Sequence, residues 1–161
     1  MRFLRLHHWL LVTRRRLVIT GLLLAGVAWA CPAQADPALL AAINAERQRA
    51  GLGRLQADAA LDAAAAAHAA DLARCGQLSH SGCDGSELPD RLRRAGYIYT
   101  FAAENIALGP EDAAATLAAW LDSPPHRANL LRAEPTEVGI GRALQDGRPL
   151  WVLVLGKRYQ R

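Results

Sequence analysis

The sequence predicts an α+β domain in which helices come first and an antiparallel sheet closes the chain. Three stretches carry apolar residues at helical spacing: 36–50, 58–74 and 113–122. Near the end of the chain, 137–143 and 150–155 are rich in β-formers and flank a turn at 145–147, which is a strong hairpin signal. Helices followed by a hairpin favour helical layers packed on an antiparallel sheet.

The first 35 residues are predicted to be an export signal. An arginine-rich start precedes an apolar stretch at 17–29, and small residues at 33–35 form a typical cleavage site. This stretch is shorter than the ~18 to 20 residues that span a membrane, so a retained anchor is the less favoured alternative. The arginines at 14–16 also resemble a twin-arginine signal, and the export route stays open. We therefore expect a secreted or periplasmic protein.

Removing this segment changes what the charge implies. The whole chain has 19 Lys and Arg against 15 Asp and Glu, but five arginines and no acidic residue lie in the first 35 positions. The remaining 126 residues carry 14 basic and 15 acidic side chains and are close to neutral. This balance argues against nucleic-acid binding. The length fits one domain, at 36–161.

The cysteines are predicted to form one disulfide. Cys31 precedes the predicted cleavage point, whereas Cys75 and Cys83 remain together in an oxidising compartment. Their disulfide would close a short loop around His80 and stabilise the fold by ~2 to 3 kcal/mol. Two free thiols are the alternative. A lipoprotein cleavage box ending at Cys31 would give a lipid anchor, but Trp29 fits such a box poorly.

The first two helices differ in character. Asp36 and Pro37 suit the N-cap and the first position of a helix that ends at 51–53. The stretch 58–74 has a narrow face of small apolar residues, suited to close packing against a sheet. His68 lies on that face, so we interpret it as a core histidine or a support for a nearby site.

The later elements are shorter. A short helix is expected at 89–96, β-forming residues at 97–107, and a helix at 113–122 with acidic residues at its positive end. Pro124-Pro125 is expected to stop that helix.

Three short segments hold the candidate site: His80 in 77–81, Glu104 in 103–107 and His126 in 120–131. Two imidazoles and a carboxylate can bind a divalent ion or transfer protons. Taken singly, His80 is as well explained as a loop histidine, and His126 as a cap of the turn after the two prolines. The hypothesis of a shared site therefore depends on the three occurring together.

The motifs together resemble the bacterial branch of the CAP superfamily, which includes cysteine-rich secretory proteins, antigen 5 and pathogenesis-related proteins. Trp120-x-x-Ser123-Pro124-x-His126-Arg127-x-Asn129 carries the resemblance with 103–107, Ser79-His80 and 137–141. The opening 43–47 and the strand at 150–152 fit as well. The resemblance implies an α-β-α sandwich with a three- or four-stranded antiparallel sheet between helical layers.

The resemblance also implies a cleft with two histidines and two acidic residues, in which some members hold a metal. His80 and His126 stand at the two histidines, as candidate ligands for zinc or magnesium, and Glu104 at the first acidic position. Ser123 stands where eukaryotic members have glutamate, so one anionic partner is missing. Asp122 is adjacent, but consecutive helical residues point about 100° apart and one does not replace the other.

The remaining motif residues are expected to be structural. We interpret Trp120 as core, Glu137 as a solvated or paired carboxylate, and Arg127 and Asn129 as bracing the turn that carries His126.

Three functions compete. We favour a secreted, monomeric binding module whose cleft, at His80, Glu104, Ser123 and His126, recognises a small ligand, lipid, peptide or cell-wall fragment. The alternative is a metal-dependent hydrolase, a peptidase or esterase, in which the histidines hold the ion and Glu104 activates water. The sequence has no nucleophile elbow and no His-Glu-x-x-His pair, which disfavours hydrolysis. A scaffold for a partner protein ranks third.

Overall fold

The computed structural model describes residues 36–160, so the predicted export signal and Cys31 lie outside it. The elements follow in this order: α1 (Pro37–Arg49), β1 (Gln56–Ala57), α2 (Ala59–Cys75), α3 (Leu88–Arg94), β2 (Tyr99–Leu108), α4 (Ala113–Asp122), α5 (Pro124–Leu130), β3 (Glu137–Gln145) and β4 (Arg148–Arg158). The predicted helices are present close to their expected bounds. Within 36–160, no helix has both the length and the apolar character to cross a membrane.

The sheet has four strands in the order β1-β3-β4-β2, so β2 is an edge strand. β4 pairs antiparallel with both β3 and β2. The expectation of a wholly antiparallel sheet is wrong at the other edge, where β1 pairs parallel with β3 and Gln56 lies opposite Glu137. β1 has only two residues, too few for an alternating pattern to be recognised in the sequence.

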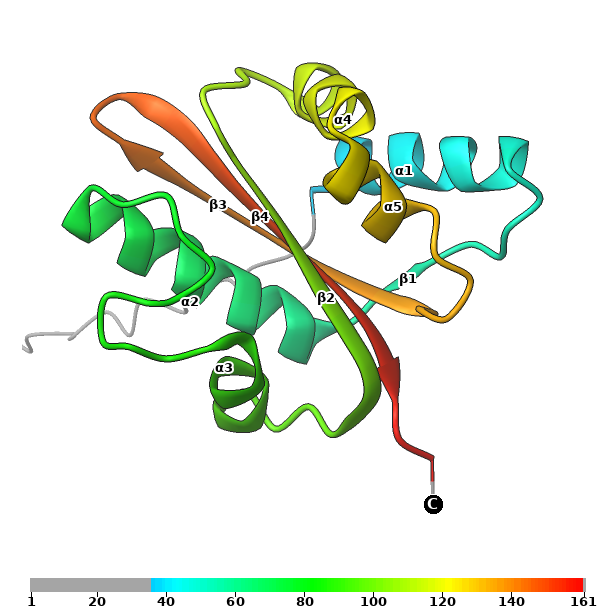
Figure 1. Cartoon of the computed structure of the whole chain (residues 1–161), viewed down its shortest axis with the longest axis horizontal. Coiled ribbons are helices and arrows are strands. Elements are labelled where there is room, and N and C mark those ends of the chain that lie inside the picture. Colours follow the sequence, from blue (N-terminus) through cyan, green and yellow to red (C-terminus); the bar gives the residue numbers. More distant parts are fainter. Residues whose placement is uncertain (1–35, 161) are drawn as a thin grey trace, which may run out of the picture. The chain divides into compact units, whose positions relative to one another are not determined.

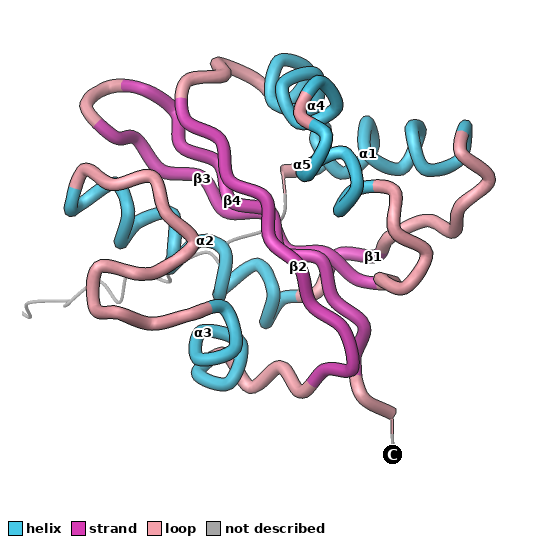
Figure 2. The backbone as a smooth tube through the Cα atoms, viewed as in Figure 1, coloured by secondary structure: helices cyan, strands magenta, loops and turns pink. Residues whose placement is uncertain are grey.

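Helices cover both faces of the sheet, which gives the α-β-α sandwich that the sequence predicted. Figure 1 shows α2 and α3 on one side of the strands and α1, α4 and α5 on the other, and Figure 2 shows the strands between the two helical layers. β4 is buried almost throughout, and its alternate side chains enter two cores. Trp151, Leu153 and Leu155 pack with α1, α4 and α5. Leu150, Val152 and Val154 pack with α2 and α3.

The alanine-rich face of α2 lies directly against β3 at two glycines. A Cβ atom added to Gly139 would lie 2.0 Å from the carbonyl carbon of Leu61, and one added to Gly141 would lie 2.3 Å from that of Ala65. Both distances are far below van der Waals contact, so only glycine fits at this spacing. The close packing predicted for this helix is confirmed, and it fixes the position of His68 farther along the same helix.

The two prolines behave differently from expectation. Pro124-Pro125 was expected only to stop a helix, but the prolines also begin α5, at its first two positions. Proline is tolerated there because the first amide groups of a helix have no intrahelical acceptor. Ser123 before them is extended, with φ −96° and ψ 112°, which separates α4 from α5. His126 is therefore in a short helix and not in a turn.

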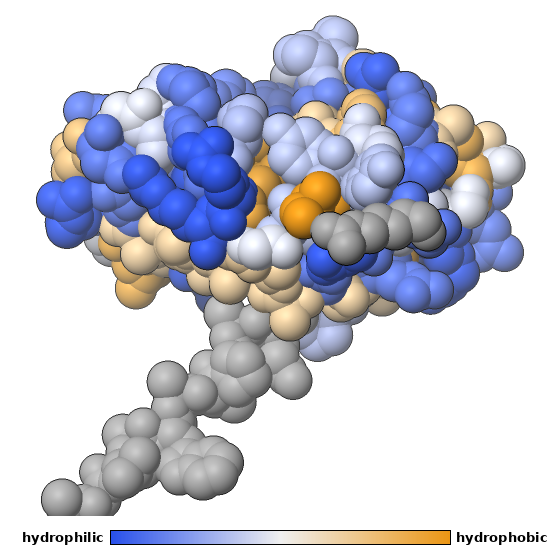
Figure 3. Space-filling view, turned by 90° about the horizontal axis from the view of Figure 1, so that it is seen from below, coloured by the Kyte–Doolittle hydropathy of each residue, from blue (hydrophilic) through white to orange (hydrophobic). Residues whose placement is uncertain are grey.

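The surface of the described residues is largely polar. Leu78, Ile98, Leu144 and Tyr159 are its exposed large apolar side chains. In the face shown in Figure 3, strongly hydrophobic residues form a small patch among hydrophilic ones. A function is therefore best sought among the polar groups.

Candidate functional site

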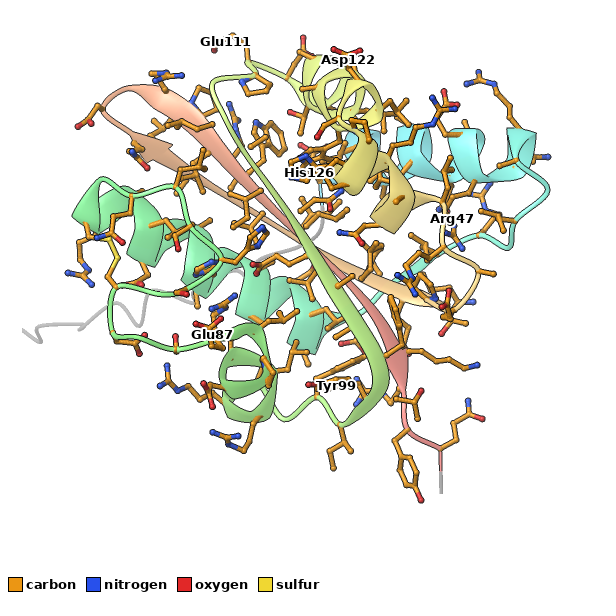
Figure 4. The ribbon with its side chains drawn as sticks, in the orientation of Figure 1. Arg47, Glu87, Tyr99, Glu111, Asp122 and His126 are labelled. Atoms are coloured by element: carbon orange, nitrogen blue, oxygen red, sulfur yellow. A yellow bond between two sulfur atoms is a disulfide. The ribbon has the colours of Figure 1, made fainter. Side chains whose placement is uncertain are left out.

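The candidate site forms around β2, the edge strand. Successive residues of a strand point to opposite faces, and Glu104 and Asn105 follow this rule. Glu104 contacts Arg91 of α3 and His68 of α2, whereas Asn105 contacts α5 at His126. Figure 4 shows His126 at the start of α5, beside β2. The edge strand thus brings together side chains from both helical layers.

Glu104 is a buried carboxylate with basic partners on both oxygens. Its side chain is 3% exposed. Oε1 lies 2.8 Å from Nδ1 of His80, and Oε2 accepts a 2.8 Å hydrogen bond from the guanidinium of Arg91. Nε2 of His68 lies 3.8 Å from Oε1. His80 and Glu104, two of the residues expected to share a site, are therefore in direct contact.

Arg91 is the site residue that sequence reasoning missed. It is 6% exposed, whereas Arg93 and Arg94 of the same short helix are exposed. Besides Glu104, its guanidinium donates to the backbone carbonyls of His80, at 3.0 Å, and Ser86, at 2.8 Å. Three arginines occur within four residues of this helix, and nothing in their type tells which of them is buried. A signal existed only in the helical spacing, because Arg91 lies three residues after Leu88 and four before Ala95, which both pack against the core.

The loop that carries His80 is closed by the predicted disulfide between Cys75 and Cys83, which is present. The amide of Cys83 also donates to Asp71 of α2, at 2.7 Å. The loop is therefore attached to α2 through a covalent bond and a hydrogen bond. It presents the His80 side chain at 61% exposure, although the carboxylate beneath it is buried.

His68 supports this loop from below. It is 1% exposed, as its place on the apolar face of the helix predicted. Its Nε2 lies 3.2 Å from the carbonyl oxygen of Ser79, so Nε2 carries a proton and donates. Burial lowers the pKa of His68 although the Glu104 carboxylate opposes this shift. A neutral, buried His68 therefore holds the residue next to His80.

His126 reaches the site from the other layer. Its Nδ1 lies 2.9 Å from the hydroxyl oxygen of Ser123. The pKa of His126 is lowered, first by burial and then by the positive charge of His80. Nδ1 has a neighbour in both residues, which leaves Nε2 of each for a ligand.

A small amide network joins α5 to β2. Asn105 donates to the carbonyl of His126 at 3.0 Å, and Asn129 donates to the side-chain oxygen of Asn105 at 2.9 Å. The same Asn129 amide lies 3.3 Å from the carbonyl of Glu104. Asn129 therefore braces the segment of His126 as predicted. Arg127 does not share this network: it is exposed and lines a surface pocket with Leu121 and Leu131.

The other interpreted residues lie away from the site. Trp120 is 1% exposed in the core, as predicted. Glu137 is paired, as expected: it accepts a hydrogen bond from the hydroxyl of Tyr97 and lies 3.9 Å from Arg158. Asp122 is exposed at the end of α4, as Figure 4 also shows.

The donor set is incomplete for a metal site with three protein ligands. Structural and catalytic zinc sites take three or four. Both oxygens of Glu104 face basic groups, so this carboxylate is not free to join the two imidazoles. Among residues 36–160, no group of three or more His, Cys, Asp and Glu is arranged to hold an ion. His80 and His126 alone remain as nitrogen donors.

The sequence is similar to those of two known bacterial proteins. The chain is 35% identical over 98 residues to the uncharacterized protein YkwD of Bacillus subtilis (strain 168). These 98 residues are 61% of this chain and 38% of YkwD. The chain is also 33% identical over 98 residues to the uncharacterized membrane protein YlbC of the same strain, covering 61% and 28%. The chain thus spans well under half the length of these curated relatives.

Solved structures share the fold. An extracellular protein containing a SCP domain from Bacillus anthracis str. Ames has a TM-score of 0.70 and 29% identity, with 74% of this chain and 39% of that chain covered. An outer surface protein from Borrelia burgdorferi also has a TM-score of 0.70, at 24% identity, covering 75% and 90%. The model of the cysteine-rich secretory protein (CAP) family matches residues 40–155. The chain therefore belongs to the CAP family, as a bacterial member with its α-β-α sandwich.

Proposed function

We propose that this chain is an exported binding module whose cleft, formed by His80, Glu104, Ser123 and His126, recognises a small ligand, lipid, peptide or cell-wall fragment. The observation that carries this proposal is the state of Glu104, whose two oxygens are taken by His80 and Arg91. The carboxylate thus serves to hold the exposed imidazole in place.

The same contact argues against hydrolysis. A general base must reach a water and the proton that it removes, within hydrogen-bond distance. Glu104 has its side chain 3% exposed and already accepts from two donors. His80 and His126 offer imidazole nitrogens at the cleft, which suits recognition of polar groups. A binding module therefore uses this geometry unchanged. A hydrolase would have to free Glu104 from its contacts with His80 and Arg91.

Export is proposed from the pattern of the first 35 residues, with residues 36–161 as the mature CAP domain. The printed descriptions of two relatives, an extracellular protein and an outer surface protein, support this location. Of the two metal ions expected, zinc suits a pair of imidazole donors better than magnesium, which prefers oxygen ligands.

Calorimetry against envelope lipids, peptides and cell-wall fragments tests the proposal. We expect one class of probe to bind wild type without turnover, and His80→Ala and His126→Ala to lose at least tenfold in affinity. Asp122→Ala is the matched control, because Asp122 is exposed beside the same segment. Product formation from any probe would instead indicate a hydrolase. A partner protein captured equally well by all variants would indicate a scaffold.

A further inference from the structure

Arg91 makes more contacts than its ion pair with Glu104 alone. One guanidinium bonds three acceptors: Oε2 of Glu104, the carbonyl of His80 and the carbonyl of Ser86. It therefore holds both the backbone of His80 and the carboxylate that meets the side chain of His80. Both ends of that histidine are fixed relative to one buried cation.

The orientation of Glu104 then determines where His80 carries its proton. With Oε2 on the guanidinium, Oε1 faces Nδ1 of His80 at 2.8 Å. An ionised carboxylate accepts only, so Nδ1 must be the donor. In a neutral imidazole one nitrogen carries the proton and the other keeps a lone pair. Nε2 of neutral His80 is then an acceptor at the cleft.

We propose that Arg91 is a positioning residue of the cleft, which holds His80 in the Nδ1–H tautomer so that Nε2 is presented as a hydrogen-bond acceptor. This inference rests on the proposed binding function and narrows its ligand class. The group that meets neutral His80 is a hydrogen-bond donor, such as a hydroxyl, an amide N–H or an ammonium, or a metal cation. A carboxylate or phosphate oxygen has no proton to donate to that nitrogen and is disfavoured there.

The chemistry of arginine suits this role. Its guanidinium is planar and presents donors in a fixed fork, so it can meet a carboxylate and two carbonyls at set angles. A lysine ammonium is a compact charge on a flexible stem and does not reproduce this geometry. The contact of His126 does not determine which of its ring nitrogens carries the proton, because the Ser123 hydroxyl can donate or accept. The tautomer of His80 is therefore the more strongly defined of the two.

The test is long-range ¹H–¹⁵N NMR of the histidine side chains at pH 8, where neutral tautomers are distinguished by their nitrogen shifts. Wild type is expected to show His80 with Nδ1–H. Arg91→Met and Arg91→Gln are expected to shift His80 toward the Nε2–H form, which predominates for a histidine in water. Arg94→Met is the matched control, since Arg94 lies on the same helix, is exposed and pairs with Asp84 outside the site. It should leave the spectrum of His80 unchanged.

Two results would overturn the proposal. One is Nε2–H at His80 in wild type, which can be read whether or not the Arg91 variants fold. The other is an unchanged Nδ1–H signal in a folded Arg91 variant. The measurement uses the full mature chain without ligand, so failure of every binding probe would remove the proposed function and leave this result standing. Conversely, ligand binding with an Nε2–H His80 would remove only the role of Arg91.

Discussion

The hydroxyl oxygen of Ser123 lies 2.9 Å from Nδ1 of His126, at the junction of α4 and α5. The family resemblance identified Ser123 as the place where a glutamate is missing. In the structure the serine also has a role of its own: its hydroxyl contacts the imidazole of His126 without adding a charge. The acidic neighbour Asp122 is exposed and takes no part. At this position the site therefore has a neutral hydroxyl beside His126 in place of a carboxylate.

Replacing Ser123 with glutamate should change the titration of His126. The pKa of His126 is lowered by burial and by the charge of His80. A carboxylate beside the imidazole favours the protonated form and should raise this pKa by about 1 unit or more. NMR titration of the histidine ring measures the shift. Asp122→Glu is the control and should leave the pKa of His126 nearly unchanged. Equal shifts in both variants would mean that the contact with Ser123 is not specific.

Removal of the Cys75–Cys83 bond should lower the stability of the fold. The bond closes a loop over a sequence separation of eight residues. The chain-entropy estimate for such a loop is about 2.5 kcal/mol of unfolding free energy. Urea denaturation of a Cys75→Ala, Cys83→Ala double variant measures the loss. Dithiothreitol should lower the wild-type midpoint and leave that of the variant unchanged. Identical midpoints in oxidising buffer would contradict a stabilising disulfide.

Much of the fold could be predicted from local signals in the sequence. The Asp36-Pro37 and Asp112 starts, the hairpin turn at Asp146-Gly147 and the narrow face of α2 each depend on residues within a few positions of one another. Such signals survive in a linear sequence. The pairing of Cys75 with Cys83 was also local, because the two residues lie in one short segment.

The relationships that were missed join distant segments or depend on geometry. The parallel pairing of β1 with β3 connects residues about 80 positions apart and involves only Gln56 and Ala57 in β1. The role of Arg91 depends on which arginine of a short charged helix faces inward. The start of α5 at Pro124-Pro125 has two interpretations, because proline both ends one helix and suits the first turn of another. In these cases tertiary packing selects among local alternatives.

The packing of α2 on β3 predicts a severe effect of Gly141→Ala. The added Cβ would lie 2.3 Å from the backbone of Ala65, and backbone atoms in the middle of a packed helix do not move aside easily. We expect a loss of about 3 kcal/mol in the free energy of unfolding. Gly53→Ala is the matched control, since a Cβ there meets nothing within 4 Å, and it should change stability little. Thermal and urea unfolding measure both. Equal stability of the two variants would contradict the close contact.

Zinc binding should be weak and should depend on both histidines. With Glu104 held by Arg91, the protein contributes two imidazole nitrogens, fewer than the three or four ligands of a typical zinc site. Calorimetry with zinc at pH 7.5 should give one site in wild type and none in a His80→Ala, His126→Ala double variant. Magnesium should not compete, because it prefers oxygen ligands. Equal zinc content in both proteins would place the metal elsewhere.

His68 should make the stability of the fold depend on pH. Burial lowers its pKa in the folded state below the ordinary value of 6.5, so the unfolded chain takes up a proton first as the solution is acidified. The stabilising contribution of neutral His68 is therefore complete above pH 6.5 and declines as the pH falls from there toward the lowered pKa. His68→Gln keeps a donor for the carbonyl of Ser79 but does not titrate, so its stability should fall less between pH 7.5 and pH 5.5. Urea midpoints across this range measure the difference. Parallel pH profiles in wild type and variant would mean that His68 is protonated as easily in the folded protein as in the unfolded chain.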